Sequence, residues 1–116
     1  MRTPDTRSDL LQGTLELLIL TALSLEPMHG WGISIRLRQI SGEVFDVNQG
    51  SIYPALMRML KRGLIKSTWR SSENNRRARY YELTRAGMLE LEAQRAEWER
   101  SSRAVDRVLR FAFQGG

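Results

Sequence analysis

The sequence predicts a mainly α-helical fold with one small β-hairpin, in the α+β class. Four segments carry apolar residues at spacings of three and four, which is the period of a helix that buries one face. One later segment instead holds β-branched and aromatic residues in two short runs around a polar turn. With 116 residues, the chain has enough material for one domain with a modest core, and not for two independent ones.

The first expected helix begins at a cap formed by Ser8 or Asp9 and ends near Leu25. Its apolar residues occupy nearly every face, so this helix must be buried nearly all round. In so short a chain, either a partner subunit covers part of the helix or the rest of the monomer encloses it. A partner subunit would contact Leu11, Leu15 and Leu18.

A turn that contains proline and glycine, at 26–30, separates this helix from a second one over 30–40. A short apolar connector leads to a third helix, which Asn48 caps and which runs to about Arg62, where Gly63 is suited to stop it. Two helices joined by a short turn are typical of proteins that read DNA with the second helix of the pair.

Residues 64–70 and 79–83 are expected to form the two strands of a hairpin, with a polar and basic turn between them. Trp69 and Tyr81 are expected to pack within this hairpin and against the core. Thr84 then caps a long final helix. The hairpin would thus follow the third helix directly, in the place of a wing.

This order of elements, helix, helix–turn–helix, hairpin and helix, is that of a winged helix. We therefore expect a winged helix–turn–helix domain over 9–84 and a C-terminal dimerisation helix over 85–113. Residues 1–8 are expected to form a flexible arm, and residues 114–116 a disordered end.

The chain is basic, with 18 Lys and Arg against 13 Asp and Glu and a formal net charge of +5. Such a balance suits a polyanionic partner, although a merely solvated basic surface gives the same composition. The positions are more informative, because a dense basic cluster between residues 58 and 79 contains a single acid, Glu73. The cluster favours DNA as the partner, with an acidic protein on the same surface as the alternative.

The third helix is the candidate reading helix, because the major groove of B-DNA admits one helix whose first turns reach the base edges. Gly50 lets the backbone approach closely, and the positive end of the helix favours phosphate. The candidate contacts on this helix are Asn48, Gln49, Ser51, Tyr53 and Arg58. Asn48 can alternatively serve only as a cap, and Gln49 can simply be exposed.

The basic hairpin supplies a second set of candidate contacts, because guanidinium groups bind phosphate oxygens in a bidentate manner. These contacts are Arg70, Asn74, Asn75, Arg76, Arg77 and Arg79. A basic turn on its own is often merely solvated. Its position directly after a helix with a polar, glycine-containing start is what favours DNA.

The final helix carries an apolar stripe in which Leu91, Trp98 and Val105 are seven residues apart, and Leu109 widens it. The rest of the chain is too small to cover both this helix and the first one, so the stripe predicts a twofold homodimer. The alternative is a helix packed on its own domain. Trp98 is either a stacking wall for an effector or a core anchor between helices.

Other classes of function lack the residues that they need. The chain has no cysteine and a single histidine, and we expect neither catalysis, nor a metal site, nor a cofactor. It shows no signal-like N-terminus and no apolar span of about 20 residues, and the acids of the last helix argue against membrane binding. We therefore expect a cytoplasmic protein.

Residues 50–56 read GSIYPAL, and residues 79–87 read RYYELTRAG after a GLI at 63–65. Together these motifs closely resemble the PadR family of bacterial transcriptional regulators, and the likeness extends over nearly the whole chain. Residues 29–33, HGWGI, resemble the start of the second helix in that family, where tyrosine is usual in place of Trp31.

The resemblance implies a homodimeric repressor of neighbouring genes, and a twofold dimer would bind a roughly palindromic operator in double-stranded DNA. In that family the first and last helices form the dimer interface, and some members respond to small aromatic or drug-like molecules. Trp98 is therefore the candidate effector contact. The start of the second helix adds His29 and Trp31 as candidate DNA contacts, and Trp31 can donate only through its indole nitrogen.

Overall fold

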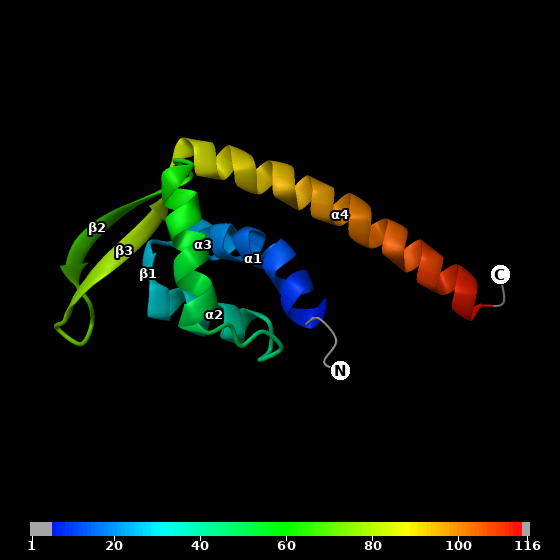
Figure 1. The fold of residues 1–116 in the computed structure, drawn as a ribbon, viewed down its shortest axis with the longest axis horizontal. Helices are drawn as coiled ribbons and strands as arrows, with labels where there is room; N and C mark the ends of the chain where they lie inside the picture. The colour runs from blue at the N-terminus through cyan, green and yellow to red at the C-terminus, as the bar shows by residue number, and fades with distance from the viewer. Residues whose placement is uncertain (1–5, 115–116) are drawn as a thin grey trace.

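The computed structural model describes the backbone of residues 6–114 and the side chains of residues 14–114. In chain order the elements are α1 (Thr6–Leu25), β1 (Met28–His29), α2 (Gly30–Ile40), α3 (Gln49–Lys61), β2 (Ile65–Ser71), β3 (Arg77–Leu83) and α4 (Arg85–Phe113). Within residues 6–114, four helices and one small antiparallel sheet confirm the predicted α+β class. Figure 1 shows α1, α2, α3 and the sheet gathered at one end, with α4 running away from them as a long arm.

The sheet of the described chain has three antiparallel strands in the order β1–β3–β2. The sequence predicted only a turn at 26–30, and this was wrong: Met28 and His29 pair with Tyr81 and Tyr80 as strand β1. A strand of two residues is too short to show an alternating pattern, so the turn residues around it dominated the prediction. Strand β1 ties the start of α2 directly to the hairpin.

Strands β2 and β3 form the wing, which pairs from Ile65↔Leu83 at its base to Ser71↔Arg77 near its tip. Both strands extend further toward the tip than expected, and a bond of 2.7 Å from Ser72 N to Arg76 O closes the turn. The wing is therefore a long two-stranded ribbon of which only the base lies on the core.

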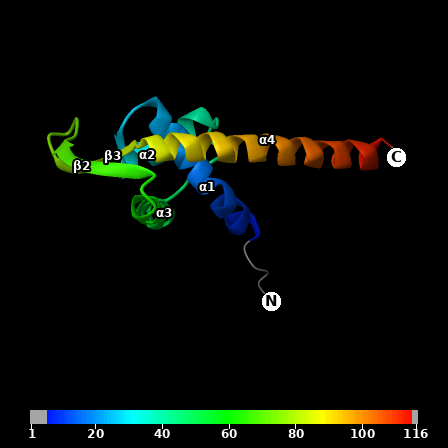
Figure 2. The same ribbon diagram turned by 90° about the horizontal axis from the view of Figure 1, so that it is seen from above.

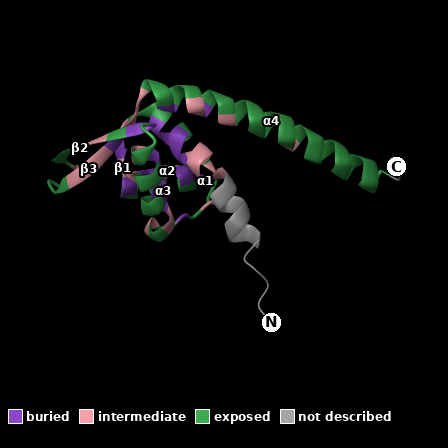
Figure 3. Cartoon of the chain, turned by 45° about the horizontal axis from the view of Figure 1, so that its top comes forward, coloured by how far each residue is buried: buried purple, intermediate pink, exposed green. Residues whose placement is uncertain are grey.

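Helix α1 forms the centre of the domain. Leu15, Ile19 and Leu20 are at most 1% exposed, and α1 packs against α2, α3, α4 and β3. The monomer therefore encloses this part of the helix, and Leu15 is not available to a partner subunit as the sequence had suggested. Leu18 is half-buried against the same core. Figure 3 shows the buried residues concentrated where these elements meet.

The ends of α1 and of the chain differ in part from the prediction. Helix α1 begins at Thr6, so residues 6–8, which were expected in the arm, are helical. The rest of the expected arm, residues 1–5, and the side chain of Leu11 lie outside the described residues, as do residues 115–116.

The end of α3 is set by local signals that the sequence shows. Gly63 has a left-handed φ of 73°, its amide bonds to Leu60 O at 3.1 Å, and the amide of Leu64 bonds to Met59 O at 3.0 Å. This pair of bonds is a Schellman motif, in which a glycine satisfies the last carbonyls of the helix. Thr84 Oγ1 then donates to Gly63 O at 2.6 Å, which fixes the start of α4 beside the end of α3.

Helix α4 packs into the core only through its first turns. Leu91 is 9% exposed and belongs to the core of its own monomer, so its predicted place at a dimer interface was wrong. Residues 103–113 are all exposed, and Figure 2 shows the C-terminal part of α4 extending clear of the domain. The other predicted interface residues, Trp98, Val105 and Leu109, are 49%, 56% and 47% exposed.

Replacing Gly87 by alanine should destabilise the fold. A Cβ atom at this position would lie 2.0 Å from Leu64 O, which is backbone and cannot rotate away. We expect the free energy of unfolding to fall by about 2–3 kcal/mol, as for an overpacked core, measured by urea unfolding. Without the clash, alanine would raise helix stability by about 1 kcal/mol, so an increase would contradict this account of the packing.

Candidate DNA interface

The N-terminal end of α3 presents polar side chains at the surface of the domain. Asn48 is exposed and caps the helix, because its Oδ1 accepts a bond of 3.0 Å from Ser51 N. This bond uses only the oxygen of the amide, so the cap leaves its nitrogen free to donate to a further partner. Tyr53 is 48% exposed, and Ser51 is half-buried. The helix end thus combines hydrogen-bonding groups with the positive end of the helix dipole.

Gln49 takes a different place from its neighbours. Its side-chain nitrogen donates to Gly30 O at 3.2 Å and to Ser34 Oγ at 3.1 Å, both on α2. A Cβ atom at Gly30 would lie 3.0 Å from Gln49 Oε1, so the close approach of α2 and α3 here favours glycine. Gln49 therefore joins the two helices of the helix–turn–helix instead of pointing out to solvent.

Contacts with Ser67 and Tyr81 position Arg79 on one face of the wing. Arg79 Nε donates to Ser67 Oγ at 2.8 Å, and its guanidinium lies 5.8 Å from the ring centre of Tyr81. Burial raises the pKa of the Tyr81 hydroxyl, the charge of Arg79 opposes this shift, and nearby Tyr53 adds to it. Tyr81 is 2% exposed, as expected of a packing residue, and Arg79 of the wing lies over its ring.

Trp69 is the wing residue whose environment the sequence did not show. It was expected to pack, but it is 58% exposed and sits opposite Arg79, with Arg77 5.3 Å from its ring centre. Nothing in the local pattern distinguishes an exposed strand tryptophan from a buried one. The strand extends past the edge of the core, so the indole is exposed and has Arg77 and Arg79 beside it.

The remaining wing residues divide between two sides. Asn74, Asn75 and Arg76 are exposed at the tip. Arg70 lies on the opposite face of the ribbon, 4.1 Å from the ring centre of Tyr80. The tip also holds Glu73, whose carboxylate is 3.6 Å from Nε2 of His29.

Both ring nitrogens of His29 have neighbours within the fold. It caps α2, accepting a bond of 3.0 Å from Gly32 N at its Nδ1, and meets the ring of Tyr80 edge-on at 5.2 Å between centres. With Glu73 beside its other nitrogen, the imidazole holds the wing against the start of α2. Trp31, by contrast, is 62% exposed on the first turn of that helix.

Ion pairs neutralise the basic residues at the end of α3 and at the base of the wing, but not the wing arginines. Arg58 Nε lies 3.6 Å from Glu16, and Arg62 and Lys66 also have carboxylate partners. Among the described residues, no carboxylate lies within 4.0 Å of the wing arginines, which are Arg70, Arg76, Arg77 and Arg79. Arg58, a predicted DNA contact, thus turns toward α1, whereas the wing keeps uncompensated positive charge.

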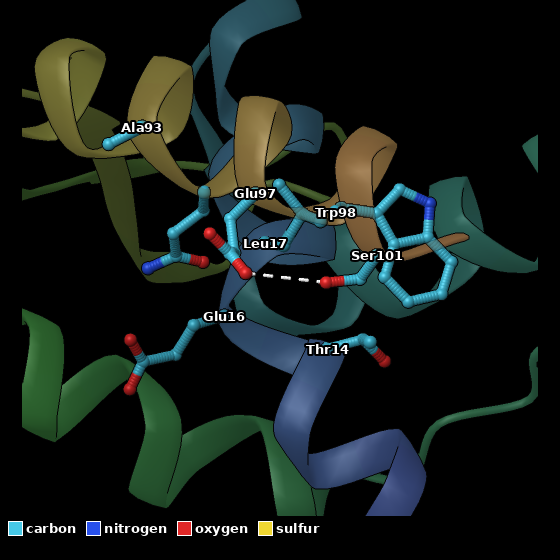
Figure 4. Close-up of a pocket in the computed structure, with 8 residues that line it drawn as sticks. Thr14, Glu16, Leu17, Ala93, Glu97, Trp98 and Ser101 are labelled. Carbon is cyan, nitrogen blue, oxygen red and sulfur yellow. Dashed lines mark hydrogen bonds between the residues drawn. The ribbon is translucent and has the colours of Figure 1, made fainter. Parts of the chain in front are cut away.

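A cavity of about 500 Å³ lies between α1 and α4, on the other side of the domain from the wing tip. It is lined by Thr14, Glu16, Leu17, Ala93, Gln94, Glu97, Trp98 and Ser101. Figure 4 shows the indole of Trp98 at one end and the carboxylate of Glu97, bonded to Ser101, beside it. The cavity therefore combines an aromatic surface with two acids.

The part of the chain that the structure describes contains neither a metal centre nor a membrane-spanning helix. Residues 14–114 bring together no group of three His, Asp or Glu side chains that could hold a metal ion. None of the described helices combines the length and the apolar character needed to cross a membrane.

Solved structures of similar proteins match almost the whole chain. A PadR-like transcriptional regulator from Bacillus cereus is 35% identical with a TM-score of 0.76, and the match covers 87% of this chain and 96% of that one. A transcriptional regulator from Clostridium thermocellum is 28% identical with a TM-score of 0.77, covering 86% and 94%. A PadR family regulator from Clostridium difficile is 30% identical with a TM-score of 0.73, covering 84% and 99%.

Residues 19–93, more than half of the chain, match the family described as the transcriptional regulator PadR-like family. This span runs from the middle of α1 to the part of α4 that packs on the domain. It includes the helix–turn–helix, the wing and the motifs that carried the resemblance in the sequence. The protein belongs to the PadR-like family of transcriptional regulators.

Proposed function

We propose that this protein is a homodimeric repressor that binds a roughly palindromic operator in double-stranded DNA. The observation that carries the proposal is the position of the uncompensated charge. Among the described residues the arginines of the wing lack carboxylate partners, whereas Arg58 and Arg62 at the C-terminal end of α3 are paired with Glu16. DNA is a dense polyanion, and a face of this kind attracts it without losing internal ion pairs.

In this proposal α3 enters the major groove by its N-terminal end. Asn48, Ser51 and Tyr53 contact base edges or phosphates there. The wing lies over the flanking backbone, where Arg76, Arg77 and Arg79 bind phosphates and Asn74 and Asn75 donate hydrogen bonds. Trp69, exposed beside two of these arginines, packs on the sugars of the same strand.

A second copy of the chain covers the exposed stripe of α4. Trp98, Val105 and Leu109 share one face of the helix and are about half exposed, and Val105 and Leu109 lie in the fully exposed C-terminal part of α4. An apolar stripe of this kind on a protruding helix is typical of an interface. A twofold dimer presents two reading helices, which matches two half-sites of an operator.

The cavity between α1 and α4 is the candidate effector site. The half-exposed indole of Trp98 suits a flat aromatic molecule, and the carboxylates of Glu16 and Glu97 favour one with positive charge. The site borders the stripe where the second subunit would lie, so a ligand there would act on the dimer and release it from DNA.

A mobility-shift titration against duplexes from the protein's own promoter region tests the proposal. Measurements at two salt concentrations, with nonspecific competitor, should give a discrete complex that competitor does not remove. Selection from random duplexes locates the operator if that region lacks it. Failure to enrich any sequence in the selection would contradict sequence-specific binding and favour an acidic protein as the partner.

Replacing Arg76 and Arg77 by alanine should weaken binding to all duplexes alike. The loss of two phosphate contacts should make the slope of log K against log salt shallower by about two, with affinity falling about tenfold. Titrations at four salt concentrations measure this slope. The Arg100→Ala/Arg103→Ala variant removes the same charge from α4 and should keep the slope; an equal change in both variants would remove the wing from the interface.

Replacing Gln49 by alanine should lower stability and leave sequence preference unchanged. The change removes two hydrogen bonds between α2 and α3, so the free energy of unfolding should fall by about 1–2 kcal/mol. Thermal unfolding and competition between operator variants measure the two effects. An altered ranking of operators at unchanged stability would instead make Gln49 a base contact, as its sequence position first suggested.

Replacing Val105 by aspartate should dissociate the dimer. The interface would bury this carboxylate without a partner. The free-energy cost of that burial is far larger than the contribution of the apolar contact that Val105 makes there. Sedimentation should show monomer at micromolar concentration, and operator affinity should fall with it. Ala96→Asp adds the same charge on the opposite side of α4 and should remain a dimer; dimerisation of both variants would place the interface elsewhere.

A further inference from the structure

A polar bridge joins three helices at the C-terminal end of α3. Glu16 of α1 accepts a hydrogen bond of 3.1 Å from Arg62 Nη1, and its other carboxylate oxygen lies 3.6 Å from Arg58 Nε. Arg62 also reaches α4, with 3.6 Å between its Nη2 and Glu90 Oε2. Gln94 Nε2 donates to that same oxygen of Glu90 at 2.8 Å. The end of the reading helix is thus tied to both α1 and α4.

Two members of this bridge, Glu16 and Gln94, also line the cavity between α1 and α4. Figure 4 shows Glu16 reaching from α1 toward the ribbon of α3, below the wall that α4 forms. The side chain of Glu16 is 21% exposed, whereas those of Arg58 and Arg62 are about half exposed. The Glu16 carboxylate is therefore the group that the cavity and the reading helix share.

We propose that Glu16 is a positioning residue that couples this cavity to the reading helix. Its carboxylate holds Arg58 and Arg62, and so fixes the C-terminal end of α3 relative to α1 and α4. A cationic group in the cavity competes for that carboxylate and loosens this end of α3. The inference rests on the DNA-binding function proposed above and assigns the route by which the cavity regulates it.

The effect should appear in DNA recognition more than in stability. Single exposed ion pairs contribute little to folding, but a network that spans three helices fixes their relative placement. In a dimer held by α4, the distance between the two reading helices depends on how each α3 sits on its α4. Operators with a fixed half-site spacing are sensitive to that distance, and nonspecific duplexes are not.

The full-length Glu16→Gln variant tests the coupling, with Glu97→Gln as its matched control. Both remove one negative charge from the same cavity, but Glu97 bonds only to Arg100 and Ser101 of its own helix. We expect Glu16→Gln to lower the ratio of specific to nonspecific affinity about fivefold, within the range of measured couplings, and Glu97→Gln to leave it unchanged. Equal ratios in the two variants would overturn the proposal.

Arg62→Gln, alone and combined with Glu16→Gln, shows whether Glu16 acts through the reading helix. If it does, the double variant should lose much less than the product of the two single losses. Fully independent losses would mean that Glu16 acts by another route. Thermal unfolding reports the folded fraction of each variant, and a wild type without any sequence preference would instead refute the proposed function itself.

Gln94→Lys places a tethered cation at the cavity wall, and Gln94→Met is its neutral counterpart. The ammonium group should draw Glu90 and Glu16 away from Arg62, so operator affinity should be about threefold lower than that of the methionine variant. An added positive charge ordinarily strengthens binding to DNA. Tighter operator binding by the lysine variant would therefore contradict the coupling.

Discussion

The burial of α1 is the constraint on which the rest of the structure depends. A helix that is apolar on nearly every face needs neighbours all round, and α2, α3, α4 and β3 supply them for Leu15, Ile19, Leu20, Ala22 and Leu23. Each of these elements packs one face against α1 and leaves another face exposed to solvent. Helix α3 keeps its polar start, the wing keeps its tip, and α4 keeps the stripe beyond Leu91. The central helix thus determines which surfaces remain for the proposed contacts with DNA and with a second subunit.

Charge follows the same division. Where α3 lies against α1 and α4, its basic residues find carboxylates, so Arg58 and Arg62 strengthen the contact between helices. Where the wing leaves the core, no carboxylate of the described chain accompanies the arginines on the side of Trp69. The basic cluster that looks uniform in the sequence therefore consists of two groups of residues with different structural roles. One group holds the domain together, and the other remains available to a polyanion.

Local signals predicted most of the fold, and long-range packing decided what they could not predict. Asn48, Gly63 and Thr84 carry their capping chemistry within a few residues, so the bounds of α3 and α4 were predicted closely. An apolar residue, by contrast, indicates burial without saying which subunit provides it, which is why Leu15 and Leu91 were misassigned to a dimer interface. Gln49 turns inward because of Gly30 and Ser34, which lie 19 and 15 residues away, and nothing adjacent to it shows this.

The two ends of α3 are held by different sets of contacts, and a rigid helix can connect these two sets in a regulator. Its N-terminal end is held by Gln49 against α2 and can present Asn48 and Tyr53 in one orientation. Its C-terminal end is held by Glu16, whose carboxylate a cavity also reaches. Because the helix is stiff, a displacement of its C-terminal end also moves its N-terminal end, and the hydrogen bonds within the helix stay the same. With the proposed coupling, a regulator of this size needs no separate ligand domain to connect a cavity with its DNA-reading surface.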